Sequence, residues 1–245
     1  MALGSDAVFD LTVVGGGPAG SAAAITAAKK GLRVLLMEAG SFPRHKVCGE
    51  FISAEAVTQL RSLLSPANAA LLNSAARISE VRLHVDGKTA RLRLGRSAIS
   101  LSRAQLDLSL WQSAQEYGVT CEEKCRVKII DNGGTDFRVL AEDREFRARA
   151  VVNCSGRWSE LNPPRERQAE RDQRWIGIKG HFHESDCAST CDLYFFPSGY
   201  CGVLPVQNGN DGMVNAAAMV RSDAARNFEE LSNVDSALKE RMRSW

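Results

Sequence analysis

Residues 10–20 read DLTVVGGGPAG, an apolar run that leads directly into the motif G-x-G-x-x-G. The glycines of the motif are Gly15, Gly17 and Gly20. The alanine-rich segment 21–30 follows, and a second apolar run at 33–37 ends on Glu38. This order predicts a strand, a tight turn, a helix and a second strand.

Each glycine of the motif has a physical reason to be there. Gly15 permits the sharp turn, Gly17 leaves room for a pyrophosphate against bare backbone, and Gly20 lets the helix lie close to the sheet. The start of the helix directs unpaired N–H groups at the anion. Glu38 ends the second strand, where a carboxylate can accept hydrogen bonds from an adenosine ribose. The segment therefore predicts a dinucleotide site.

The acid at Glu38 bears on which dinucleotide is bound. A carboxylate repels a 2′-phosphate, which disfavours NADP in this site. FAD and NAD both stay open from this unit alone, although its position near the N-terminus is typical of flavoproteins. A simple NAD-dependent dehydrogenase is the weaker alternative, because it does not account for the motifs that follow.

Four later segments occur in a recognisable order. They are Ser41–Glu50 with the sequence SFPRHKVCGE, Ser100–Asp107, Ala150–Ser159 and Pro197–Pro205. Together they resemble the geranylgeranyl reductase-like branch of FAD-dependent oxidoreductases, in the wider p-hydroxybenzoate hydroxylase superfamily that also holds the flavin-dependent halogenases. The resemblance implies FAD as the cofactor. It also implies an α/β fold in which a Rossmann-like FAD-binding domain is interleaved with a mixed β-sheet substrate domain.

The same resemblance implies a set of cofactor-binding residues. They are Gly15, Gly17, Pro18, Ala19, Gly20, Glu38, Ala39, Arg44, Cys48, Gly49, Arg103, Val127, Ser155 and Gly156. Arg44 brings positive charge near a pyrophosphate. Cys48 beside Gly49 suits a flat ring, although for nucleophilic catalysis a buried structural thiol is the better interpretation. The sequence identifies no catalytic residue.

Arg103 occupies an electrostatically unfavourable position. Ser102 is a candidate N-cap for a helix that ends near Gly118. A cation in the first turn opposes the helix dipole, which indicates an anionic partner nearby. The resemblance suggests FAD as that partner, and a merely exposed arginine is the alternative.

Composition excludes several classes of function. The chain has 245 residues, a net charge of +2, 44% hydrophobic and 24% charged residues, as in an ordinary globular protein. The charge favours no nucleic-acid partner. No apolar run reaches the about 20 residues of a transmembrane helix, and no secretory signal is visible. We expect a cytoplasmic protein, with peripheral membrane contact and oligomeric state left open.

The seven cysteines do not predict a disulfide framework, because their number is odd and the chain is long. His181, His183, Cys187 and Cys191 form a cluster in sequence. Its spacing matches no standard zinc module, and alternation along a strand already places both histidines on one face. We therefore predict no metal site.

Secondary-structure patterns divide the chain. The FAD-binding domain takes 1–75 and 100–160, and the substrate domain takes 76–99 and 161–245. We expect one or two helices in 53–73, broken at Ser65-Pro66, and a helix in 223–242. Hairpins are expected at 78–94, turning at Asp86-Gly87, and at 126–140. The other expected elements are a short strand at 150–154 buried on both faces, an exposed loop at 162–174, and three or four strands in 175–220.

The implied function is that of an FAD-dependent oxidoreductase, a reductase or monooxygenase for a small or lipid-like substrate, with NAD(P)H as candidate electron donor. Halogenation is disfavoured, because the segment Gly199–Pro205 lacks the two tryptophans of the halogenase motif. The family's third motif, a Gly-Asp pair, is also missing. We therefore expect a truncated form with an incomplete FAD site, and a non-catalytic protein with a binding or regulatory role is the alternative.

Overall fold

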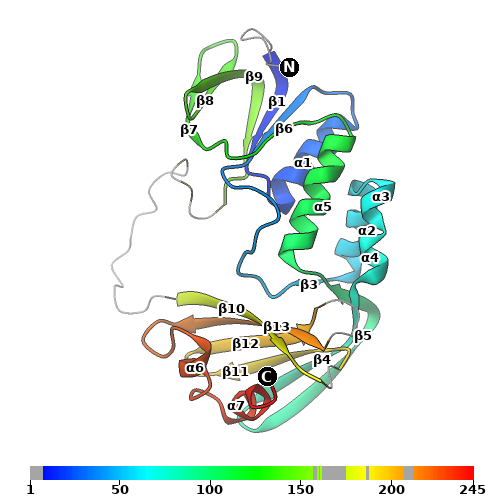
Figure 1. Cartoon of the computed structure of the whole chain (residues 1–245), viewed down its shortest axis with the longest axis vertical. Coiled ribbons are helices and arrows are strands. Elements are labelled where there is room, and N and C mark those ends of the chain that lie inside the picture. The colour runs from blue at the N-terminus through cyan, green and yellow to red at the C-terminus, as the bar shows by residue number, and fades with distance from the viewer. Residues whose placement is uncertain (1–7, 157–158, 160, 162–174, 186–187, 207–211) are drawn as a thin grey trace. The chain divides into compact units, whose positions relative to one another are not determined.

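The computed structural model describes residues 8–156, 159, 161, 175–185, 188–206 and 212–245. The chain divides into two compact units (Figure 1). Unit 1 consists of 1–44, 62–69 and 104–167, and unit 2 consists of 45–61, 70–103 and 168–245. The exposed loop expected at 162–174 lies outside the described residues. Each unit is built around its own mixed sheet, which confirms the predicted α/β fold class.

Unit 1 contains a six-stranded sheet in the order β6-β2-β1-β9-β8-β7. β6, β2, β1 and β9 pair in parallel, and the hairpin strands β8 and β7 join antiparallel at one edge. The strands are β1 (Val8–Val14), β2 (Val34–Met37), β6 (Thr120–Glu122), β7 (Val127–Asn132), β8 (Phe137–Ala141) and β9 (Arg144–Asn153). The predicted strand–turn–helix–strand unit and the hairpin at 126–140 are confirmed.

Helix α1 (Pro18–Ala28) starts three residues earlier than the predicted 21–30. Its N-cap is Gly17, and Pro18 is its first residue. A proline is tolerated there because the first N–H of a helix has no intrahelical partner and the ring fixes a helical φ. The chain leaves the helix through Gly31, whose φ is +82°. The motif and the helix therefore share residues.

Helix α5 (Arg103–Glu116) matches the predicted helix, with Gly118 at φ +81° after its end. It buries an apolar face made of Leu106, Leu110, Trp111 and Ala114. A Cβ placed on Gly16 would lie 2.7 Å from the Trp111 ring, so the helix packs directly on the glycine-rich turn.

The strand predicted at 150–154 was wrong in length and burial. β9 begins at Arg144, and Val152 is 39% exposed. Val151, its neighbour, packs against the core under β1 and β8. Successive side chains of a strand point to opposite faces, so this end of β9 has one covered and one open face.

Unit 2 contains a seven-stranded sheet in the order β10-β13-β12-β11-β4-β5-β3. Among the described strands, β11 and β4 are its one parallel pair. The strands are β3 (Phe51–Ile52), β4 (Ala76–Val85), β5 (Lys88–Ser100), β10 (Trp175–His183), β11 (Thr190–Phe196), β12 (Gly199–Pro205) and β13 (Met213–Arg221). The hairpin turning at Asp86-Gly87 and the four strands after residue 175 are confirmed.

The break predicted at Ser65-Pro66 is confirmed, and both predicted helical regions contain more and shorter helices than expected. The region 53–73 forms α2 (Ala54–Leu63), α3 (Pro66–Ala69) and α4 (Leu71–Ser74). The region 223–242 forms α6 (Phe228–Leu231) and α7 (Ser236–Met242). Asp235 divides the second region, because its side chain accepts a hydrogen bond from the Leu238 N–H and starts a new helix.

The two faces of the unit 2 sheet differ sharply. Helices α6 and α7 cover one face, where Val203, Val214 and Leu238 form a buried core (Figure 1). We call the opposite face the open face. By strand register this face carries Cys191 and Leu204, which are buried in a second core cluster. It also carries the large apolar side chains Val85, Leu92, Trp175, Phe195, Tyr200 and Met219. Each of these side chains is more than a third exposed.

Candidate functional site

Two glycines of the unit 1 turn are required by the fold. Gly15 has a φ of +106°, and a Cβ there would lie 2.3 Å from the Cys154 carbonyl oxygen. A Cβ on Gly20 would lie 1.8 Å from the Gly15 carbonyl oxygen. No side chain fits at either distance. These contacts confirm the steric need for glycine at Gly15 in the turn and at Gly20 in helix α1.

Gly17 has a different environment. Among the described residues, the one atom within 4 Å of a Cβ placed there is Arg44 Nη2, at 3.8 Å. The fold itself therefore does not need a glycine at this position. Helix α1 begins immediately after it with no side-chain hydrogen bond at its cap and no acidic residue in its first turn. Space and helix N–H groups together fit a phosphate approaching bare backbone.

Glu38 organises this turn. It is 6% exposed, and its Oε2 accepts a hydrogen bond from the Gly16 N–H at 2.8 Å. Its Oε1 accepts from the Gly40 N–H and from Arg44 Nη1, both at 2.9 Å. Both carboxylate oxygens therefore have partners within the chain. Glu38 therefore holds the turn. A hydrogen bond from a ribose hydroxyl to Glu38 stays a prediction.

Arg44 lies beside two acids and one aromatic ring. Its guanidinium pairs with Glu38 and is 3.8 Å from Asp107. Its central carbon is 5.0 Å from the centre of the Phe42 ring, which lies 4.8 Å from Trp111. Nε of Arg44 is buried, and no described residue accepts a hydrogen bond from it. A buried donor without an acceptor is costly, so this group fits an anionic ligand such as a pyrophosphate.

The other predicted cofactor residues of unit 1 lie in different elements and differ in exposure. Pro18 and Ala19 begin α1, while Ser155 and Gly156 follow β9. Gly156 has a φ of +87°. Ala39 is exposed beside Glu38. Val127 is 8% exposed and lies in the sheet core with Val139, so only its backbone is offered to a ligand.

The remaining predicted residues belong to unit 2 and surround an acid that sequence reasoning missed. Glu50 is 2% exposed and directly follows Cys48 and Gly49. Its carboxylate accepts hydrogen bonds from the Arg103 N–H at 2.9 Å, from His181 Nε2 at 3.0 Å and from Lys179 Nζ. An anion does therefore lie at the start of α5, and it is a carboxylate of the chain. Whether the Arg103 side chain contacts FAD stays a prediction.

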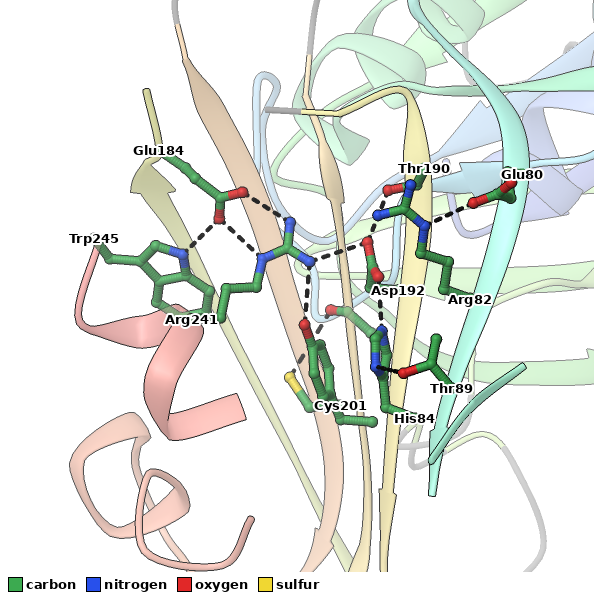
Figure 2. Close-up of polar contacts among 12 residues, drawn as sticks. Glu80, Arg82, His84, Thr89, Glu184, Thr190, Asp192, Cys201, Arg241 and Trp245 are labelled. Carbon is green, nitrogen blue, oxygen red and sulfur yellow. Dashed lines mark hydrogen bonds and ion pairs between the residues drawn. The ribbon is translucent and has the colours of Figure 1, made fainter. Parts of the chain in front are cut away.

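A second polar network in unit 2 lies on the face that α7 covers (Figure 2). Arg241 donates to both oxygens of Glu184, at 3.0 and 2.9 Å, and lies 3.0 Å from Asp192. The Trp245 indole N–H donates to the same Glu184 carboxylate at 2.8 Å. These bonds tie the last helix to the sheet, on the side away from the open face. We assign this network to stability.

Asp192 is the charged centre of that network. Burial opposes its ionisation, but hydrogen bonds from His84 and Thr190 and the charge of Arg241 outweigh burial and bring the Asp192 pKa below its ordinary value. Burial also disfavours the charged form of Arg241, but the hydrogen bonds to Glu184 and Tyr194 outweigh burial and raise the Arg241 pKa. Both groups are therefore charged at neutral pH.

The six described cysteines are free thiols: Cys48, Cys121, Cys125, Cys154, Cys191 and Cys201. Burial raises the pKa of Cys191 to about 11 and those of Cys121 and Cys201 to about 12. Cys187, one of the four residues of the His181–Cys191 sequence cluster, lies outside the described residues. In the part of the chain that the structure describes, no three His, Cys, Asp or Glu residues gather as a metal site, and no helix is long and apolar enough to cross a membrane.

Comparison with known proteins gives consistent matches. The family model described as FAD dependent oxidoreductase matches residues 10–157. Digeranylgeranylglycerophospholipid reductase 1 of Methanococcoides burtonii is 30% identical over 226 residues, which cover 82% of this chain and 52% of that protein. Menaquinone reductase of Mycolicibacterium smegmatis is 50% identical over 54 residues, 22% of this chain and 13% of that protein.

The fold also occurs in solved structures. The myxobacterial chondrochloren halogenase, an FAD-dependent halogenase, superimposes with a TM-score of 0.77 at 21% sequence identity. The match covers 97% of this chain and 60% of the halogenase. At that identity the likeness concerns the fold. The chain spans little more than half the length of this halogenase and of the archaeal reductase.

Proposed function

The chain belongs to the FAD dependent oxidoreductase family, and from that premise we propose that it is a reductase or monooxygenase for a small or lipid-like, largely apolar substrate. In this proposal the glycine-rich turn of unit 1 binds the FAD pyrophosphate, and the open face of unit 2 binds the substrate. When bound, FAD supplies the two-electron chemistry. Arg44 and the α1 N-terminus bind its phosphates, and Glu38 orients the turn.

One observation supports the substrate class. All the exposed large apolar side chains that belong to the described strands β4, β5 and β10–β13 lie on the open face: Val85, Leu92, Trp175, Phe195, Tyr200 and Met219. The rings of Phe195 and Tyr200 are 5.9 Å apart and form an aromatic pair. Exposed apolar side chains gathered on one face of a sheet favour a binding site, because covering them releases roughly 25 cal/mol for each Å² removed from water.

The relatives favour reduction of a lipid. Their names give digeranylgeranylglycerophospholipid and menaquinone as substrates of reductases, and both fit an apolar face better than a charged metabolite would. Halogenation remains disfavoured, because Tyr200 and Gly202 stand in β12 where the halogenase motif has tryptophans. NAD(P)H is the proposed electron donor.

The proposal is tested by anaerobic reoxidation. The chain is incubated with FAD, reduced with NADPH or dithionite, and mixed with menaquinone or with a geranylgeranyl glycerophospholipid; the fully saturated lipid is the control. We expect the visible band of oxidised flavin to return with an acceptor and not with the saturated lipid. Return only on admitting oxygen, with hydroxylated product, identifies the monooxygenase. A chain that stays colourless after incubation with FAD supports the non-catalytic alternative.

A further inference from the structure

The segment Lys46–Glu50 lies directly on the open face, across β10 and β13. Asn215 Nδ2 donates to the Cys48 carbonyl oxygen at 3.1 Å. Lys179 Nζ lies 3.4 Å from the Lys46 carbonyl oxygen. A Cβ placed on Gly177 would lie 2.8 Å from Val47 Cγ1, so glycine at that point of β10 lets the segment approach the strand.

Glu50 ends this segment in an uncommon backbone conformation. Its φ is +60°, in the left-handed region that a glutamate rarely adopts. Such a conformation persists where surrounding contacts hold it, and it is concentrated at functional sites. Here the Glu50 carbonyl oxygen accepts from the Leu101 N–H at 3.1 Å, and its carboxylate has three donors.

The three donors come from distant parts of the chain. Lys179 and His181 stand on β10 with alternate spacing, so both side chains point to the open face, and the Arg103 N–H begins α5. The Glu50 side chain is fully buried, while those of Lys179 and His181 are 8% and 24% exposed. A buried carboxylate is tolerated when it is paired and fully hydrogen-bonded, as this one is.

We propose that Glu50, held by Lys179 and His181, is a positioning residue that fixes the Cys48–Gly49 turn on the sheet before the cofactor arrives. The inference rests on the proposed function and on the prediction from sequence that Cys48 and Gly49 contact FAD. Cys48 Sγ is turned back to the Glu50 N–H at 3.4 Å. No described atom lies within 4 Å of a Cβ placed on Gly49, so that side of the turn is open to a flat ring.

If Glu50 positions the Cys48–Gly49 turn, disturbing it should affect binding of the flavin ring of FAD and not of the ADP half. Lys179→Met leaves the Glu50 carboxylate buried without its cation, and the turn shifts to let water reach it. The ADP half of FAD is bound by the glycine-rich turn of unit 1, whose contacts do not involve Lys179. The variant should therefore weaken binding of FAD and not of ADP.

The experiment measures dissociation constants of FAD and ADP and the visible spectrum of bound flavin for four proteins. They are the wild type, Lys179→Met, the conservative Lys179→Arg, and the control Lys128→Met, which removes an exposed pair with Glu142. We expect Lys179→Met to bind FAD about tenfold or more weakly, with ADP binding unchanged and the spectrum altered. Lys179→Arg should regain most of the affinity, and the control should stay within about twofold of wild type.

The failures are distinguishable. If the wild type binds neither FAD nor ADP, the proposed function fails. If the wild type binds both and Lys179→Met binds FAD like the wild type, the positioning role is overturned; equal losses for FAD and ADP overturn it too, because they indicate general damage. Should Lys179→Met not fold, His181→Ala replaces it, and a loss of FAD affinity with ADP affinity unchanged is again required.

Discussion

Arg44 Nη1 donates to Oε1 of Glu38 at 2.9 Å, while Oε2 of the same carboxylate accepts from the Gly16 N–H at 2.8 Å. One acid thus links the glycine-rich turn to the arginine beside it. The pair is shielded, with side-chain exposures of 18% for Arg44 and 7% for Glu38. The turn is therefore held in place by the chain itself.

This linkage predicts a cost for losing the acid. Glu38→Ala should weaken FAD binding by roughly 1.5–3 kcal/mol, the range for a hydrogen bond to a charged group, because the turn loses its acceptor and the ribose loses a candidate partner. Titration by fluorescence quenching measures the loss, and thermal unfolding without FAD shows how much of it is stability. An unchanged dissociation constant for FAD would show that Glu38 has a structural role only.

The three glycines of the motif should separate into two classes. Gly20→Val places atoms where the Gly15 carbonyl oxygen lies, so we expect a large loss of stability or no folded protein. Gly17→Val points into space with one described neighbour, so the variant should unfold within a few degrees of wild type. Circular dichroism melts of both variants test this. Equal melting losses would contradict the assignment of the Gly17 space to a ligand.

The network around Asp192 should make acid unfolding depend on this residue. Its pKa is lowered from 3.8 in the folded chain, so it adds stability above that value and loses it as the pH falls through the folded pKa. The melting temperature of wild type should therefore fall on acidification below pH 3.8, and that of Asp192→Asn should start lower and fall less. Parallel curves for the two proteins would show that Asp192 is not a stabilising acid.

The buried thiols should be unreactive in the native chain. A thiol pKa of about 11 for Cys191 and about 12 for Cys201 leaves little thiolate at neutral pH, and both side chains are buried. Iodoacetamide followed by peptide mass spectrometry should label these positions only after unfolding in denaturant. Rapid native labelling of Cys201 would contradict its place under α7.

Local patterns were sufficient for the glycine-rich turn of unit 1. The strand, the turn and the helix around Gly15 and Gly20 follow from steric needs of neighbouring residues, so sequence alone predicts them. The predicted start of α1 was wrong, because the prediction treated Pro18 as part of the turn. Glu50 was missed because nothing near it marks a buried acid: its cation, Lys179, is 129 positions away, and tertiary contact alone brings them together.

Binding of FAD by the glycine-rich turn of unit 1 can be measured by a fluorescence-quenching titration of the purified chain with FAD. The titration is repeated with ADP as competitor and with the Gly17→Val variant. We predict saturable binding of one FAD for each chain, competed by ADP and lost in Gly17→Val while its melting curve is retained. Absence of saturable binding by the wild type, or equal FAD affinity in a folded Gly17→Val variant, would contradict FAD binding by this turn.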